Sequence, residues 1–421
     1  MAPVILDLPH GLRIVTEELP NIHSVSMGIF TKVGSRYETK PVSGVSHFLE
    51  HMLFKGTQRR NARELSESIE GIGGFINAST SYDSTVYFAK VADIHFDRAV
   101  DTLSDMLLHS KFDPKEVTKE RRVIIEEINM SHDDPGEWVY HLLNRSMWGD
   151  QPLGWDIAGT AETMAGVGRD ELLAYQAQHY TMPSTVISIA GNRSTTEMVD
   201  TWVKALAGYP EGQVYEPTHT EPVRPGPKLT FLQKETEQAN FCLGLPGLSY
   251  NDPDRRPLQV LDSVLGGGMS SRLFQEIREE RGLAYSVFSD TSEFNDAGSW
   301  IIGGGVDLSK ATEAIRACLD VMSKLRDEGI TEGELQRVKE QAKGRMLLGL
   351  EDSWSVAARN GSHILRYGRV LPVEQFVAEI EAVTQEDVLR VAQRLVRSDG
   401  LHLSVIGPYE DSAPFEDLLS F

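Results

Sequence analysis

Short stretches in which apolar and polar residues alternate recur along the first half of the chain and predict β-strands. The predicted strands cover residues 12–16, 25–31, 74–80 and 84–91, and a buried strand over 184–191 ends this half. Apolar residues three to four positions apart predict amphipathic helices over 62–74, 95–110 and 113–135. Because the strands lie close together without regular βαβ alternation, the pattern predicts an α+β fold with a largely antiparallel sheet.

The second half of the chain repeats this plan. "AVDTLSDMLLHSKFDPKEV" resembles "AIRACLDVMSKLRDEGITEGEL", and "YFAKV" and "STVISIAG" have counterparts in "WIIGGGV" and "LHLSVIGP". Between the halves, "YPEGQVYEPTHTEPVRPGPK" is rich in proline and lacks a periodic apolar pattern, which is typical of an extended linker. We therefore predict two homologous domains, 1–210 and 229–421, joined by a linker over 211–228.

Composition limits the partners and the compartment that the protein can be expected to have. The chain has 421 residues and a formal net charge of −21, which would repel nucleic acid and anionic membranes and attract basic peptides. Only two cysteines occur, so a disulfide framework is excluded and the reducing cytoplasm is the expected compartment. The sequence has neither a long apolar run nor a basic leader, so we expect no membrane span and no secretory signal.

The stretch "GVSHFLEHMLFKGT" places His47, Glu50 and His51 in an otherwise apolar helical run. At about 100° per residue, these three side chains fall within an arc of roughly 100° on one side of a helix. Two imidazoles four residues apart can bind one metal ion, and a catalytic zinc site uses three protein ligands and a water molecule. Glu50 is better placed to take a proton from the metal-bound water than to act as the third ligand.

The segment "KERRVIIEEINM" offers the missing ligand. Glu120 and Glu127 are two helical turns apart and share a face of a substantially apolar helix. One carboxylate can bind the metal while the other orients a histidine. The stretch of the second half that aligns with the motif, "RRPLQVLDSVLGGG", contains no histidine, so we predict that only the first half holds the metal.

Together these segments resemble the inverzincin metallopeptidases, the pitrilysin and insulin-degrading-enzyme superfamily. The chain is most similar to the short branch that includes the β subunit of mitochondrial processing peptidase and its bacterial relatives. The resemblance covers nearly the whole chain. It rests on "SHFLEHMLFKGT", "GGFINASTS", "YFAKV", "ERRVIIEEI" and "SSRLFQEIREERGLAYSV".

The resemblance implies one Zn²⁺ per chain, held by His47, His51 and Glu127, with Glu50 as general base. Glu126 is the competing third ligand, but the two-turn spacing from Glu120 favours Glu127. Glu120 matches a carboxylate that lies near the metal in this family and is expected to contact a ligand.

Substrate contacts are implied in both halves. Asn77 and Ala78 match residues with which the family pairs an extended peptide, a form of β-augmentation. Arg278 and Tyr285 match an arginine and a tyrosine that hold the substrate backbone, and both are sound donors to a carbonyl or an oxyanion. Arg281 is a rival for the arginine.

We therefore expect a zinc-dependent endopeptidase that cleaves extended or unfolded peptides inside a closed chamber, with zinc-bound water as the nucleophile. Two domains would form half of a clamshell, so a dimer is expected, either a homodimer or a heterodimer with a similar subunit. The alternative is a non-catalytic structural or partner-dependent subunit of the same fold. Metal analysis separates the two interpretations.

Overall fold

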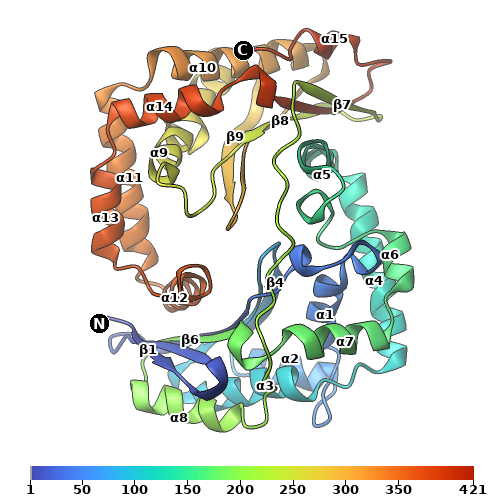
Figure 1. Ribbon diagram of the computed structural model, residues 1–421, viewed down its shortest axis with the longest axis vertical. Coiled ribbons are helices and arrows are strands. Elements are labelled where there is room, and N and C mark those ends of the chain that lie inside the picture. Colours follow the sequence, from blue (N-terminus) through green and yellow to red (C-terminus); the bar gives the residue numbers. More distant parts are fainter. Residues whose placement is uncertain (1) are drawn as a thin grey trace. The chain divides into compact units, whose positions relative to one another are not determined.

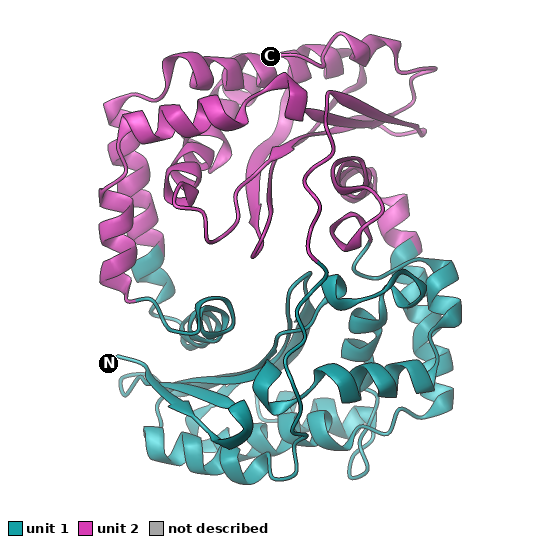
Figure 2. Ribbon diagram, in the orientation of Figure 1, with its two compact units in different colours: residues 1–128, 156–218, 346–371 teal, residues 129–155, 219–345, 372–421 magenta. Residues whose placement is uncertain are grey.

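The computed structural model describes residues 2–421, which form two compact units, each built from three stretches of chain (Figure 2). Among the described residues, unit 1 comprises 2–128, 156–218 and 346–371, and unit 2 comprises 129–155, 219–345 and 372–421. The units thus differ from the predicted contiguous ranges 1–210 and 229–421 in two stretches, 129–155 and 346–371. Residues 211–227, within the predicted linker, form neither helix nor strand.

Unit 1 is built on a six-stranded sheet in the order β1-β2-β6-β3-β5-β4. Its strands are β1 (Val4–Asp7), β2 (Arg13–Glu18), β3 (Ser24–Thr31), β4 (Phe75–Thr80), β5 (Thr85–Ala92) and β6 (Thr185–Gly191). β2 and β6 run parallel, and the other neighbouring pairs are antiparallel. β1 was not predicted, because its side chains are mostly exposed and give no clear alternation.

Helices cover both faces of this sheet. One face carries the main core of the unit, in which α3 packs on β5 and α1 packs on β4. The helices of unit 1 are α1 (Val45–Leu53), α2 (Ala62–Glu70), α3 (Phe96–His109), most of α4 (Pro114–Asp133), α6 (Ala161–Gly166), α7 (Arg169–His179), α8 (Thr195–Ala205) and α12 (Ser353–Tyr367). On the other face, Trp354 of α12 stacks on Phe88 with ring centroids 4.0 Å apart.

Unit 2 has a five-stranded sheet in the order β7-β11-β8-β10-β9. Its strands are β7 (Lys228–Gln233), β8 (Gln238–Pro246), β9 (Ala284–Glu293), β10 (Gly298–Asp307) and β11 (His402–Gly407). β7 and β11 are parallel and the other pairs antiparallel. This order reproduces β2-β6-β3-β5-β4 of unit 1 strand for strand, so the predicted α+β fold of two homologous domains is confirmed.

The helices of unit 2 repeat the same layering (Figure 1). They are α5 (Pro135–Trp148), α9 (Arg255–Gly266), α10 (Ala311–Glu328), most of α11 (Glu332–Gly349), α13 (Val373–Glu381), α14 (Gln385–Leu395) and α15 (Ala413–Glu416). α9, α10 and α14 form the core on one face, and α5 packs on β8 and β11 on the other. A Cβ on Gly244 would lie 2.5 Å from the Met147 sulfur, so this glycine permits the close approach of α5.

The sheet of each unit is therefore covered by one helix from the opposite half of the sequence, α12 in unit 1 and α5 in unit 2. This exchange explains why contiguous ranges do not describe the units. Within residues 2–421, no helix combines the length and the apolar character needed to cross a membrane.

Candidate active site

Helix α1 presents the predicted motif on the side that is turned away from the core. Its buried residues, among them Phe48 and Leu49, belong to the core of unit 1, and the half-buried motif side chains lie on the opposite side of the helix. The N-cap residue Gly44 has φ +94° and offers no capping side chain. The Glu38 carboxylate replaces the cap, accepting hydrogen bonds from Gly44 N at 2.7 Å and Ser46 N at 2.8 Å.

The structure brings together His47, His51 and Glu127. One candidate ligand atom from each lies within 4.8 Å of the other two, and the two imidazole centroids are 4.5 Å apart. Burial, reinforced by the neighbouring His51, lowers the pKa of His47 to about 4, so its ring is in the neutral form that binds metals. Nδ1 of His47 is buried without a hydrogen-bond partner among the described residues. Two imidazoles and a carboxylate are ligands that Zn²⁺ prefers, so the donor set fits this metal.

Glu120 lies behind the cluster, where it was expected. Its buried Oε1 is 2.8 Å from Nδ1 of His51, and Lys55 Nζ is 2.7 Å from its Oε2. Burial alone would raise the pKa of Glu120, but the contacts with His51 and Lys55 outweigh it and lower the pKa. An ionised Glu120 accepts a hydrogen bond from Nδ1–H of His51, which leaves the lone pair of Nε2 for a metal ion. Nε2 lies 3.6 Å from Glu127 Oε2.

Two contacts of this site were not predicted from the sequence. Lys55 follows His51 by one helical turn, and that spacing was the available signal. Thr80, at the end of β4, donates a hydrogen bond from Oγ1 to Oε2 of Glu50. Burial is the main reason that the pKa of Glu50 is raised. A proton acceptor with a raised pKa beside a metal cluster suits general acid–base chemistry.

β4, which carries Asn77 and Ala78, is an edge strand that pairs only with β5 in the described sheet. Asn77 is exposed, and its Oδ1 accepts a hydrogen bond from the backbone N–H of Ala78 at 2.9 Å. The free side of β4 offers unpaired backbone groups of the kind that an extended peptide can use.

Arg278 and Tyr285 lie together in unit 2. Arg278 belongs to a π-helix (Phe274–Glu280) and donates from Nη1 to the carbonyl oxygen of Tyr285 at 3.0 Å. Its guanidinium lies 4.8 Å from the ring centroids of both Phe274 and Tyr285, within cation–π range. Tyr285 is 77% exposed.

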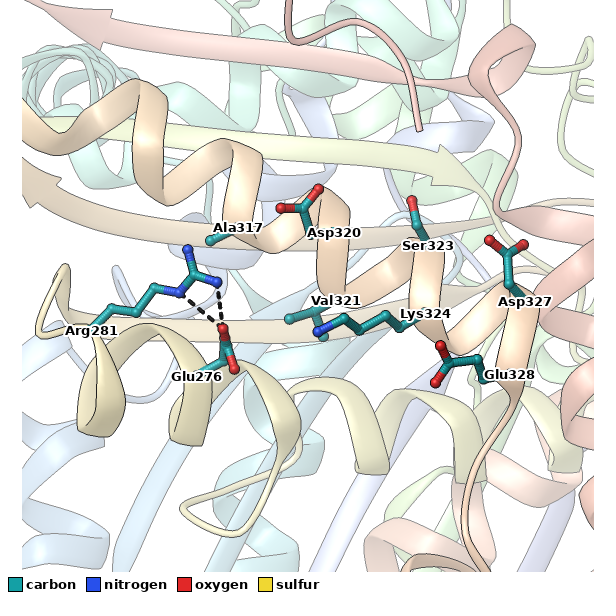
Figure 3. A pocket seen from close by; sticks show the side chains of 9 residues that line it. All are labelled: Glu276, Arg281, Ala317, Asp320, Val321, Ser323, Lys324, Asp327 and Glu328. Carbon is teal, nitrogen blue, oxygen red and sulfur yellow. Dashed lines mark hydrogen bonds and ion pairs between the residues drawn. The ribbon is translucent and has the colours of Figure 1, made fainter.

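The rival Arg281 points elsewhere. It forms an ion pair with Glu276, at 2.9 Å from Nε, on the wall of a cavity of about 280 Å³ between the π-helix and α10 (Figure 3). The remaining lining residues are Ala317, Asp320, Val321, Ser323, Lys324, Asp327 and Glu328. Within unit 2, Arg278 is thus the arginine that contacts Tyr285.

A duplicated α+β fold in which one copy carries an H-x-x-E-H helix and a downstream glutamate defines the inverzincin class of metallopeptidases. Family comparison agrees: residues 13–161 match the insulinase domain of peptidase family M16, and residues 166–342 match the peptidase M16 inactive domain. The chain belongs to peptidase family M16, the pitrilysin-like zinc peptidases.

Relatives of similar length point to the short bacterial branch. A Bacillus subtilis protein described as an uncharacterized zinc protease is 42% identical over 95% of this chain and 97% of its own. A Streptomyces coelicolor protein with the same description is 39% identical over 96% of this chain and 89% of its own.

Solved structures share the fold at low sequence identity. A protease from Helicobacter pylori superposes with a TM-score of 0.92 at 23% identity, covering 97% of this chain and 99% of its own. A peptidase M16 inactive domain from Pseudomonas fluorescens gives a TM-score of 0.89 at 19% identity, covering 97% of this chain and 98% of its own.

Proposed function

We propose that this protein is a zinc-dependent endopeptidase that cleaves extended or unfolded peptides. The observation that carries the proposal is the convergence of His47, His51 and Glu127 around one point, with Glu50 beside them on the same helix as the two histidines. These three residues would hold one Zn²⁺ per chain. When bound, the ion would polarise a water molecule and the carbonyl of the scissile peptide bond.

The protein groups perform the proton transfers and the positioning. Glu50 takes a proton from the attacking water and delivers it to the nitrogen of the leaving amine. Glu120 keeps the His51 ring in one orientation through the hydrogen bond to Nδ1. The free edge of β4 would align the peptide backbone, and Arg278 and Tyr285 would donate hydrogen bonds to the substrate.

We infer that the reaction takes place inside a chamber that dimerisation closes. The dimer would consist of two copies of this chain, or of this chain and a similar subunit. The net charge of −21 favours basic peptides over nucleic acids or anionic membranes as partners. Cys242 and Cys318 are both free and buried, in keeping with a cytoplasmic location.

The test is a cleavage assay of the purified chain against a mixed peptide library, with and without a chelator. Zinc content is measured on the same sample, and the cut sites are read by mass spectrometry. We expect about one zinc ion per chain and cleavage that chelation abolishes. A chain that binds zinc but cleaves only after a similar subunit is added would support the partner-dependent alternative. A zinc-free, inactive chain would indicate a structural subunit.

A further inference from the structure

Thr80 ends the edge strand β4 on the side that faces helix α1. Along β4, Ile76, Ala78 and Thr80 are half-buried, whereas Asn77 and Ser79 are exposed. The strand alternation therefore directs the Thr80 side chain toward α1. There its Oγ1 donates to Oε2 of Glu50, and no other described residue forms a side-chain hydrogen bond with that carboxylate.

The backbone of Thr80 is fixed by its neighbours. Thr80 pairs with Thr85 in the last register position of the β4–β5 hairpin, and the turn is closed by a hydrogen bond from Ser81 N to Ser84 O at 2.8 Å. The tip of this hairpin is clamped by the loop that precedes α1. Ser35 N donates to Ser81 O at 3.2 Å.

The same loop also holds α1. The buried Arg36 donates from its backbone N–H to Tyr82 O at 3.0 Å and from Nη1 to Asp83 Oδ1 at 2.9 Å. Two residues later, Glu38 accepts from Gly44 N at the start of α1. The donor Thr80 and the acceptor Glu50 therefore belong to two elements that one loop ties together.

We propose that Thr80 is a positioning residue for the general base, an inference that rests on the proposed function. The terminal torsion of a glutamate side chain, χ3, has a broad energy minimum, so a free carboxylate does not hold its two oxygens in one orientation. The Thr80 hydroxyl holds Oε2, which leaves Oε1 directed to the water. The proton moves from the water to Oε1 and then to the leaving amine nitrogen, while Thr80 keeps its own proton throughout. Fixing the acceptor before the reaction lowers the barrier without strengthening substrate binding.

The test compares Thr80→Val, which keeps the branched shape but removes the donor, with Thr80→Ser, which keeps the donor. We expect Thr80→Val to lower kcat about tenfold or more, within the range usual for residues that orient active-site groups. KM and zinc content should stay close to the wild-type values. Thr80→Ser should restore most of the kcat. Thr196→Val is the matched control, because it makes the same substitution at an exposed residue of α8, outside the proposed site.

Crystal structures of the zinc-free variants give a readout other than activity. The Glu50 carboxylate should occupy one position in the wild type and in Thr80→Ser, and more than one in Thr80→Val. Thr80→Ala is a second donor-free variant should Thr80→Val fold poorly.

Wild-type kcat in the donor-free variants, or equal losses in Thr80→Ser and Thr80→Val, would overturn this inference alone. A wild-type protein that binds zinc but cleaves no peptide would overturn the proposed function and this inference with it.

Discussion

Helices α1 and α9 occupy the same place in the two units, and their buried residues coincide position for position. In α1 these are Val45, Ser46, Phe48, Leu49, Met52 and Leu53, and in α9 they are Pro257, Leu258, Val260, Leu261, Val264 and Leu265. Each helix follows the central strand of its sheet, β3 or β8, and packs into the core of its unit. The two helices thus bury the same positions.

They differ on the half-buried side. On this alignment His47 corresponds to Gln259, Glu50 to Asp262 and His51 to Ser263. A carboxylate is kept in α9, where it stabilises packing, because Oδ1 of Asp262 accepts a hydrogen bond from the indole N–H of Trp300 at 2.9 Å. Asp262 therefore joins α9 to β10.

Helix α4, which carries Glu120 and Glu127, has its counterpart in α11 of unit 2. If Val117 and Leu335, the first buried residues of α4 and α11, are equivalent, Glu120 corresponds to Val338 and Glu127 to Arg345. Arg345 donates to the carbonyl oxygen of Gly267 at 2.9 Å. The comparison teaches that on α1 the row of side chains that specifies the fold is separate from the row that carries the chemistry, so that either row can change while the other is kept. On α4 the separation is incomplete, because Glu120 is itself buried, at the position of the buried Val338.

The largest effect is expected at Glu50. Glu50→Gln should lower peptide hydrolysis by about 10²–10⁴-fold, the usual share of general acid–base catalysis, because the proton acceptor is lost. Zinc content should stay near the wild-type value, whereas Glu127→Gln should lose the metal. Zinc analysis and steady-state kinetics of both variants check this. Zinc loss in Glu50→Gln with a loaded Glu127→Gln would mean that the two roles are exchanged.

Tyr285 tests whether unit 2 contributes to the chemistry at all. Tyr285→Phe should reduce kcat about 10²–10³-fold, the typical loss for one donor to a developing oxyanion, with zinc content unchanged. Arg278→Ala should also raise KM, because a charged donor to the peptide is removed. Arg281→Ala is the matched control, since Arg281 pairs with Glu276. Wild-type kinetics in both Tyr285→Phe and Arg278→Ala would show that these two residues of unit 2 take no part in the reaction.

Asp262 should affect stability and leave catalysis intact. Asp262→Ala removes the acceptor of the Trp300 indole N–H, and an unsatisfied buried donor costs about 1–3 kcal/mol. We expect urea unfolding at a lower midpoint, with zinc content and kcat of the folded fraction unchanged. A loss of zinc in this variant would contradict the separation of roles between α1 and α9.

Substitution of Glu38 should change stability in a way that depends on pH. Burial raises the pKa of Glu38 to about 8, although hydrogen bonds from Ser46 and Gly44 oppose the rise. A carboxyl group with a raised pKa in the folded state contributes stability that is complete below its ordinary pKa and is lost as pH rises to about 8.

The stability of the zinc-free wild type relative to Glu38→Gln should therefore fall between about pH 4.5 and pH 8, by at most about 1.4 kcal/mol per pH unit. Urea unfolding of both proteins across this range measures the difference. A constant difference would contradict the raised pKa.

Local patterns in the sequence predicted most elements and the residues of the His47, His51 and Glu127 cluster, because both follow from spacing along a helix or strand. His47 and His51 are one turn apart on α1, and Glu120 and Glu127 are two turns apart on α4. The exchange of α5 and α12 could not be predicted in this way, since an amphipathic helix does not indicate which sheet it covers. Thr80 was missed for the same reason: its contact with Glu50 depends on how β4 lies against α1.

The exchanged helices determine what happens to the two units when the backbone between the halves of the sequence is cut. Six consecutive segments alternate between the two units, so the backbone passes from one unit to the other five times. A protease cut anywhere in 211–227 would therefore release neither unit, because each fragment keeps a helix that belongs to the sheet of the other. The nicked protein should elute on gel filtration as one species and separate into two polypeptides only after denaturation.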